Sequence, residues 1–365
     1  MPRSVNEILA DDIVSHDVDL MRLTAKSRRT LVRSLNALQA DLIEEVRRMD
    51  MAGAARASTR HARLLKLIES ADNMVISTYK DMRGTLKSDL RDIAEITSEA
   101  AAGALEDGLA LTTQAVSLTP VQLTSIAGAA VVEGAPMKEW MGRQSARFRN
   151  GFKDQMRMGL LAGESVPRMV RRIRPLTTAA KHEVTALVRT SALSVQNEAR
   201  VTMYGENDDL IKAVQASATL DTKTSQLCRG RDKMSWTMEG VPIKRSGANF
   251  PFPGPPPWHF NCRTTLLPIT KSFEELGIKT KRKVKEIDEK RAAMDGEIVS
   301  AKMNYEAWLR RQPAARAREA LGNTRYKLWK RGKGLTMQQM LDQDGRPLSV
   351  EKLRAKYKRK VRKGT

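Results

Sequence analysis

Apolar residues in the first third of the chain recur at intervals of three and four positions. Between positions 31 and 49 the series consists of Leu31, Leu35, Leu38, Leu42, Val46 and Met49. This spacing predicts an amphipathic helix whose apolar stripe must be covered by a partner helix. We favour packing within the chain over packing against another subunit. The same helical interpretation extends over 61–79 and 86–111, where alanine is common and proline is absent.

Three more helices are predicted between positions 136 and 205. The first runs from about Pro136 to Leu161, and Gly163 is a suitable residue to cap its end. Ser165 is expected to begin a short helix, which Pro175 should end because proline lacks a backbone N–H. A longer helix is expected over 178–205. The short helix is rich in arginine.

After position 205 the pattern of apolar and polar residues changes twice. Glycine and proline are frequent over 210–269, so short strands and irregular loops are expected there, with 210–218 as the best strand candidate. Helical spacing returns after Lys271. The predicted fold class is α+β and predominantly α-helical. It comprises a helical N-terminal region (1–135), a small α+β module with a Cys/His cluster (136–270) and a basic helical C-terminal region (271–365).

The balance of charge favours a polyanionic partner. The 365 residues include 64 Lys and Arg against 42 Asp and Glu, a formal charge of +22. Two groups of basic residues stand out: Arg168, Arg171, Arg172 and Arg174 in the short helix, and Lys356, Lys358, Arg359, Lys360, Arg362 and Lys363 in a tail that we expect to be mobile. Aromatic residues are only 4%, which disfavours base stacking. Nonspecific binding of double-stranded DNA is therefore predicted. The alternative is that the charge only maintains solubility.

Other classes of protein are disfavoured by what the sequence does not contain. The first 20 residues do not have the pattern of a secretory signal, and no apolar run approaches the roughly 20 residues of a transmembrane helix. We therefore expect a soluble intracellular protein without a membrane partner. The Walker pattern and GxGxxG are both absent, which disfavours a packaging ATPase.

The segment 220–268 contains the residues with the most distinctive chemistry. It holds both cysteines, one of the four histidines and half of the prolines. Cys228, His259 and Cys262 are the ligand types that zinc prefers, and the His-x-x-Cys spacing places two of them on one turn. A closed structural zinc site needs a fourth ligand, for which Asp221 is the first candidate and Asp232 the second. The sequence thus predicts a structural zinc site at Asp221, Cys228, His259 and Cys262.

Three alternatives to a zinc site remain open. Cys228 and Cys262 could be packed thiols beside a His259 that is hydrogen-bonded to a backbone carbonyl. They could instead form a disulfide, which would need an oxidising step outside the cell. Cys228 could also be a nucleophile, with His259 as its base and Asp221 as the orienting carboxylate. A metal nuclease of the HNH type is disfavoured because the other three histidines lie in distant helical segments.

The arrangement D-x-x-T-S-x-x-C, followed by a proline run and H-x-x-C-R, resembles the phage head morphogenesis family, the minor head proteins of the Mu F type. Four elements occur in the order usual for that family: GLLAGESVPRMVRRIR, ALVRTSALSVQNEAR, DTKTSQLC and PPPWHFNCR. The positions that match its motifs are Arg189, Thr190, Asn197, Arg200, Thr224, Ser225 and Arg263. The resemblance covers roughly 148–353, and the first 130 or so residues carry no recognisable family motif.

The resemblance implies a minor head protein, present in few copies on the capsid interior near the portal vertex. Its expected partners are the portal protein, the major capsid or scaffold protein, and double-stranded DNA. Its expected location is the virion, with the host cytoplasm as the site of assembly. A role in head assembly, DNA packaging or ejection is implied, without enzymatic turnover. The alternative is a nonspecific DNA-binding protein that acts in the host cytoplasm, independent of any particle.

Overall fold

The structure is a computed structural model that describes residues 5–48, 57–109, 115–132, 135–259, 262, 264–272, 274–277, 290–300, 302–330 and 334–362. The chain divides into two compact units. We call Val18–Glu95 with Pro120–Val195 the bundle unit, and Met1–Asp17 with Ile96–Thr119 and Gln196–Thr365 the mixed unit. Each unit is described by itself. The division into 1–135, 136–270 and 271–365 stays a prediction.

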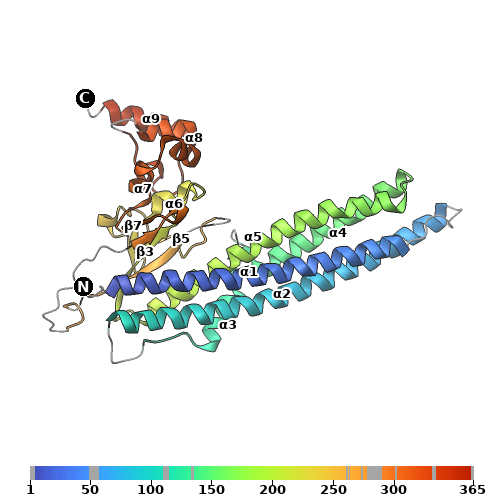
Figure 1. The fold of residues 1–365 in the computed structure, drawn as a ribbon, viewed down its shortest axis with the longest axis horizontal. Coiled ribbons are helices and arrows are strands. Elements are labelled where there is room, and N and C mark those ends of the chain that lie inside the picture. The colour runs from blue at the N-terminus through green and yellow to red at the C-terminus, as the bar shows by residue number, and fades with distance from the viewer. Residues whose placement is uncertain are drawn as a thin grey trace. The chain divides into compact units, whose positions relative to one another are not determined.

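The bundle unit is built from parts of four long helices, which Figure 1 shows as extended ribbons. They are α1 (Val5–Arg48), α2 (Ala57–Leu109), α4 (Met137–Leu161) and α5 (Val166–Glu206). A short helix, α3 (Pro120–Gly128), and a hairpin of two short strands connect α2 to α4. The strands are β1 (Val131–Val132) and β2 (Ala135–Pro136). Polar pairs link the helices, since Arg149 contacts Asp72 at 3.8 Å and Lys181 contacts Gln39 at 3.5 Å.

The predicted apolar stripe of α1 is buried within the chain. Leu31, Leu35, Leu42 and Val46 are fully buried and Leu38 is 2% exposed, whereas Met49 lies outside the described residues. Complete burial of one such side chain stabilises the fold by about 1.5–3 kcal/mol. The prediction of packing within the chain is confirmed.

The turn between α4 and α5 is a Schellman motif. Gly163 has a left-handed φ of 62°, its N–H donates to the carbonyl of Leu160, and the N–H of Glu164 donates to the carbonyl of Gly159. The predicted helix from Pro136 to Leu161 is therefore confirmed as α4. The prediction that Pro175 ends a helix is wrong, because α5 continues through it.

The helix persists through Pro175 because burial around it outweighs one lost hydrogen bond. Met169, Ile173 and Thr177 are fully buried on one face of α5, while Pro175 itself is exposed. Thr177 also donates its hydroxyl to the carbonyl of Ile173 at 3.2 Å. Tertiary packing of an amphipathic face stabilises most helices more than local propensity does.

The mixed unit contains a three-stranded antiparallel sheet in the order β4-β3-β5. The strands are β3 (Ile211–Ala218), β4 (Ser235–Thr237) and β5 (Thr264–Thr270), and α6 (Gln226–Arg231) lies between β3 and β4 in the chain. Gln215 of β3 faces Ser235 on one side and Leu267 on the other. The predicted strand at 210–218 is confirmed. A second small sheet pairs β6 (Lys290–Ala292) with β7 (Ile298–Ser300).

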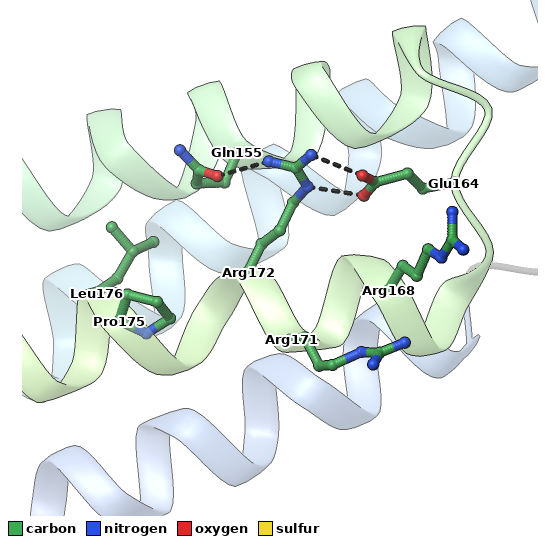
Figure 2. A pocket seen from close by; sticks show the side chains of 7 residues that line it. All are labelled: Gln155, Glu164, Arg168, Arg171, Arg172, Pro175 and Leu176. Atoms are coloured by element: carbon green, nitrogen blue, oxygen red, sulfur yellow. Dashed lines mark hydrogen bonds and ion pairs between the residues drawn. The ribbon is translucent and has the colours of Figure 1, made fainter.

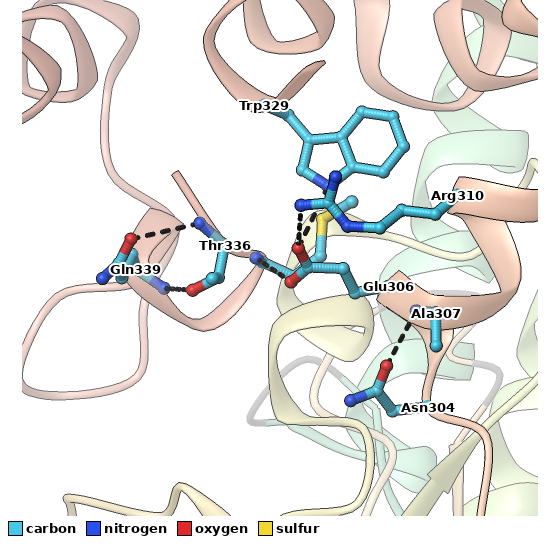
Figure 3. A network of polar contacts seen from close by, with 8 residues as sticks. Asn304, Glu306, Ala307, Arg310, Trp329, Thr336 and Gln339 are labelled. Atoms are coloured by element: carbon cyan, nitrogen blue, oxygen red, sulfur yellow. Dashed lines mark hydrogen bonds and ion pairs between the residues drawn. The ribbon is translucent and has the colours of Figure 1, made fainter. Parts of the chain in front are cut away.

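The described residues after β7 form three helices and one short 3-10 turn: α7 (Tyr305–Arg311), α8 (Ala314–Lys330), η3 (Gln338–Met340) and α9 (Val350–Arg362). Two further 3-10 turns lie earlier in the unit, η1 (Lys244–Ser246) between β4 and β5 and η2 (Met294–Gly296) between β6 and β7. Glu306 of α7 joins α8 and the start of η3: its carboxylate accepts from Arg310 and from the indole of Trp329, as Figure 3 shows, and from the N–H of Met337.

Two apolar cores stabilise this unit. Trp236 and Phe250 form one core beside the sheet, and Tyr305, Trp308 and Trp329 are central to the other. Leu353 of α9 is fully buried in the second core. The expectation of a mobile tail is therefore wrong for 350–362, because an apolar anchor orders this segment as a helix. Lys363 lies outside the described residues. The predicted class, α+β and predominantly helical, is confirmed.

Among the described helices, none combines the length and the apolar character that crossing a bilayer requires.

Candidate metal centre

The turn before α6 positions the first cysteine. One carboxylate oxygen of Asp221 accepts from the N–H groups of Lys223 and Thr224 at 2.9 and 2.7 Å, which forms a tight Asx turn. Ser225 then caps α6, since its hydroxyl accepts from the N–H of Cys228 at 3.2 Å. These contacts fix Cys228 in the first turn of α6, where it is fully buried.

The segment that follows the proline run brings the other two candidate ligands to Cys228. The N–H of Cys262 donates to the carbonyl of His259 at 3.1 Å, which holds these two residues together. The Sγ of Cys228 lies 3.0 Å from Nε2 of His259 and 3.5 Å from Sγ of Cys262. The hydroxyl of Ser225 lies 2.8 Å from the same histidine nitrogen. The ligand atoms of Cys228, His259 and Cys262 all lie within 4.8 Å of one another.

The two predicted oxygen donors are not part of this group. The carboxylate of Asp221 is engaged in its turn and also accepts from the hydroxyl of Thr224 at 3.0 Å. The carboxylate of Asp232 accepts from the N–H groups of Ala218 and Tyr305 at 2.8 and 2.7 Å, so it joins the end of β3 to the start of α7. Within the described part of the chain, the cluster therefore contains three of the four predicted ligands.

The two thiols differ in acidity because they share a hydrogen bond. That hydrogen bond from Cys262, followed by the contact with His259, lowers the pKa of Cys228 although burial opposes the shift. The same hydrogen bond and burial raise the pKa of Cys262. Cys228 is thus the thiol that ionises first, and its thiolate is the form that binds metals or acts as a nucleophile.

Sequence reasoning missed a buried cation beside the thiols. The guanidinium of Arg231 lies 4.5 Å from the ring centre of Trp258 and 5.3 Å from that of Phe250. Burial lowers the pKa of Arg231 to about 10, so the side chain stays charged at neutral pH. Its positive charge is favourable next to thiolates at Cys228 and Cys262. The Arg-Gly-Arg that follows Cys228 directly was the signal available in the sequence.

A second buried arginine fastens α6 to the C-terminal helices. Arg229 donates to the carbonyl of Thr222 at 2.8 Å and to that of Ala320, and its guanidinium lies 5.2 Å from the ring centre of Tyr305. Arg231 likewise donates to the carbonyl of Gly345 at 3.1 Å. The cluster is therefore supported from three parts of the mixed unit: α6, the proline-rich segment and the region after α7.

Several predicted motif positions hold the sheet rather than the cluster. The side chain of Asn197, which is fully buried on α5, accepts from the N–H of Leu266 at 3.0 Å and donates to the carbonyl of Thr264 at 3.5 Å. Arg200 donates to the hydroxyl of Thr265. These contacts fix β5, which directly follows the Cys262 segment.

The remaining motif positions have separate roles. Thr224 donates its hydroxyl to the carbonyl of Thr219 at 2.7 Å and so belongs to the turn before α6. Thr190 is buried and donates to the carbonyl of Ala186 at 2.9 Å, while Arg189 is exposed. Arg263 lies outside the described residues.

The predicted DNA-binding residues fall into three groups. Arg168, Arg171 and Arg174 are exposed, but Arg172 makes two hydrogen bonds to the carboxylate of Glu164 at 2.7 and 2.6 Å. Lys356 and Lys358 are exposed on α9. The side chains of Arg359, Lys360, Arg362 and Lys363 lie outside the described residues.

Comparison with known proteins gives one match. Residues 150–267 match the family model of the Phage Mu protein F like proteins. No curated protein and no solved structure matches the chain. The matched residues include Asn197, Arg200 and all three members of the Cys/His cluster. The predicted resemblance is thereby confirmed over residues 150–267, the part of the chain that is similar to the Phage Mu protein F like proteins.

Proposed function

We propose that this chain is a minor phage head protein that resides on the capsid interior near the portal vertex. The family match over 150–267 carries this proposal, since it supports a role in phage head morphogenesis. The portal protein and the major capsid or scaffold protein are the proposed protein partners. The proposed role is binding during head assembly, DNA packaging or ejection, without enzymatic turnover.

Nonspecific binding of double-stranded DNA is the second part of the proposal. The formal charge of +22 supports it, as do the exposed cations Lys352, Arg354, Lys356 and Lys358 on α9. Leu353 anchors this helix in the second core, so these basic residues are presented by an ordered element. Each phosphate contact should lower log affinity by about 0.9 per log unit of salt. A preference for sequence is not expected, because phosphate contacts carry no base information.

The third part is that the Cys/His cluster holds a structural zinc ion. Two sulfur ligands on a tetrahedral zinc lie about 3.8 Å apart, since each Zn–S bond is about 2.3 Å. The Sγ atoms of Cys228 and Cys262 are 3.5 Å apart and therefore need little movement. His259 would supply the third ligand, and the hydroxyl of Ser225, 2.8 Å from Nε2 of His259, is an oxygen next to the cluster for the fourth position. Bound zinc would supply a cross-link between α6 and the proline-rich segment.

Structural zinc is favoured over a catalytic thiol by two observations. Cys228 is fully buried and Cys262 is 8% exposed, which leaves little access for a substrate. The carboxylate of Asp221, which would orient the histidine of a nucleophilic triad, is engaged by the N–H groups of its own turn. Packed thiols remain the alternative to zinc. Metal analysis of the purified protein separates these two, and His259→Ala should remove zinc while the exposed control His61→Ala retains it.

Quantitative mass spectrometry of purified virions and of empty proheads tests the proposed location. A few copies per portal in both particles are expected. Absence of the chain from both particles would refute the head location. It would favour the second candidate, a DNA-binding protein that acts free in the host cytoplasm, for which the charge of +22 is the supporting observation.

A further inference from the structure

We propose that the tip of the α4–α5 hairpin is a docking surface for the acidic N-terminal segment of a second copy of this chain. The hairpin tip comprises 157–174, and the acidic segment comprises 5–20. The proposal does not rest on the function proposed above, since it concerns contact between copies. The arginines of the tip, which the sequence analysis predicted to bind DNA, would bind a protein segment instead.

The hairpin tip is preorganised by contacts of its own. The Schellman motif at Gly163 fixes the turn, and the carboxylate of Glu164 accepts two hydrogen bonds from Arg172. Arg172 also donates to Gln155 of α4 at 2.9 Å, so one guanidinium links both helices, as Figure 2 shows. A surface that is rigid before binding loses less conformational entropy on association.

A concave site with two exposed cations lies beside this link. The pocket has a volume of about 440 Å³ and is lined by Arg168, Arg171 and the Arg172–Glu164 pair, with Pro175 and Leu176 as its apolar part. Arg168 and Arg171 are exposed, unlike Arg172, which is engaged by Glu164. Two guanidinium groups next to an apolar floor suit carboxylates that belong to an amphipathic segment.

The apolar surroundings favour protein over DNA. Leu161 is 89% exposed and Met158 is 51% exposed, and both lie at the end of α4 next to Arg157. A phosphate backbone offers little apolar surface to cover these side chains, whereas a helix with both apolar and acidic residues offers both.

The chain itself supplies a segment with the complementary composition. Residues 5–20 contain five acids and neither Lys nor Arg, although the whole chain carries a charge of +22. The acids are Glu7, Asp11, Asp12, Asp17 and Asp19, and they are interspersed with the apolar residues Ile8, Leu9, Ile13, Val14 and Val18. The backbone of this segment is helical as the start of α1. Complementary patches of this kind determine the partner and the register of an interface.

Pairing of two different surfaces makes a heterologous contact. Such contacts build a closed ring when the rotation between neighbours closes, and an open chain when it does not. Copies of this chain repel each other overall because of their net charge, so the local pairing must be stronger than that repulsion. Self-association should therefore depend on protein concentration and on both surfaces.

The experiment measures the mass of the full-length chain by light scattering over a range of concentrations. The tip variant is Arg168→Glu/Arg171→Glu, and the segment variant is Asp11→Lys/Asp12→Lys. Each should raise the Kd of self-association by at least about tenfold. The matched control is Lys87→Glu/Arg91→Glu, two exposed cations of α2 that change the net charge by the same amount as the tip variant. This control should associate no more weakly than the unmodified chain.

Mixing the tip and segment variants provides the decisive result. The acidic tip of one variant then meets the basic segment of the other, so the mixture should form complexes that neither variant forms alone. Leu161→Asp is a second tip variant with unchanged cations, and it should also weaken association. Circular dichroism confirms that each variant is folded.

Three results would overturn the proposal. The first is a chain that stays monomeric at every concentration, and the second is a mixture that fails to restore association. The third is a tip variant that loses affinity for a short DNA duplex but keeps the mass distribution of the unmodified chain, which would assign the tip to DNA. None of these depends on where the protein resides, so failure here leaves the proposed head location untouched.

Discussion

The Cys/His cluster and the hairpin tip both gather polar side chains, but they differ in how those side chains are held. The cluster joins Cys228 to residues 31 and 34 positions away, and its members are largely buried. The tip joins Arg172 to Glu164, eight positions away, and both side chains are only partly buried. A buried polar group that loses its partner keeps the full cost of leaving water, whereas an exposed one regains water. The two sites should therefore respond to mutation on different scales.

Metal removal should give the largest effect, and it acts on the cluster. If zinc binds only the folded protein, free zinc at 1,000 times its Kd raises the free energy of unfolding by about 4 kcal/mol. Urea unfolding of metal-free protein with and without added zinc measures this difference. The His259→Ala variant should show no response to zinc. An equal gain in that variant would mean that zinc acts elsewhere, and no gain in either protein would favour packed thiols.

The next largest effect on stability should come from loss of the side-chain amide of Asn197, which supports β5. Asn197→Ala removes the acceptor of the Leu266 N–H and a donor to the Thr264 carbonyl, both of them in the interior. We expect the free energy of unfolding to fall by about 2–4 kcal/mol, since each unsatisfied buried group costs about 1–3 kcal/mol. Urea unfolding is again the measurement. The exposed control Asn150→Ala should change stability little, and an equal loss in both would contradict the assigned role of Asn197.

The difference between local patterns and tertiary contacts also explains which features the sequence could predict. The stripe of Leu31, Leu35 and Leu38 follows from period alone, because the pattern of one helix determines which face is buried. The pairing of Cys228 with His259 and Cys262 was also within reach, since few residue types serve as soft ligands and their spacing restricts the geometry.

Other parts of the site depend on tertiary contacts that no local pattern specifies. Asp221 was predicted as a ligand from proximity in sequence, but a D-x-x-T-S turn satisfies its carboxylate with backbone N–H groups. Pro175 was predicted to end a helix because local propensity disfavours it there, and burial of Ile173 outweighs that preference. Arg231 gave only a weak signal, since a basic residue in an otherwise basic chain is expected at the surface.

At the hairpin tip, a change in backbone geometry should alter stability less than zinc removal or Asn197→Ala. Gly163→Ala places a Cβ at a left-handed φ of 62°, which costs about 1–2 kcal/mol. No neighbouring atom would meet the new Cβ, so the cost arises from the backbone alone. Gly142→Ala inside α4 is the matched control, and it should stabilise the chain by about 1 kcal/mol because alanine favours helix. Thermal unfolding of the two variants should shift in opposite directions, and shifts in the same direction would contradict the Schellman turn.

Loss of the Arg172–Glu164 ion pair at the tip should have the smallest effect on stability, and this effect should depend on pH. The hydrogen bond from Arg172 lowers the pKa of Glu164 below its ordinary value of 4.5. A carboxylate whose pKa is lowered by folding stabilises the folded state fully above that ordinary value, and this contribution disappears as the pH falls through the lowered pKa. Glu164→Gln should therefore melt at a slightly lower temperature than the unmodified chain at neutral pH, and the difference should close in acid. A difference that stays constant from neutral to acid pH would show that shape rather than charge holds Arg172 between α4 and α5.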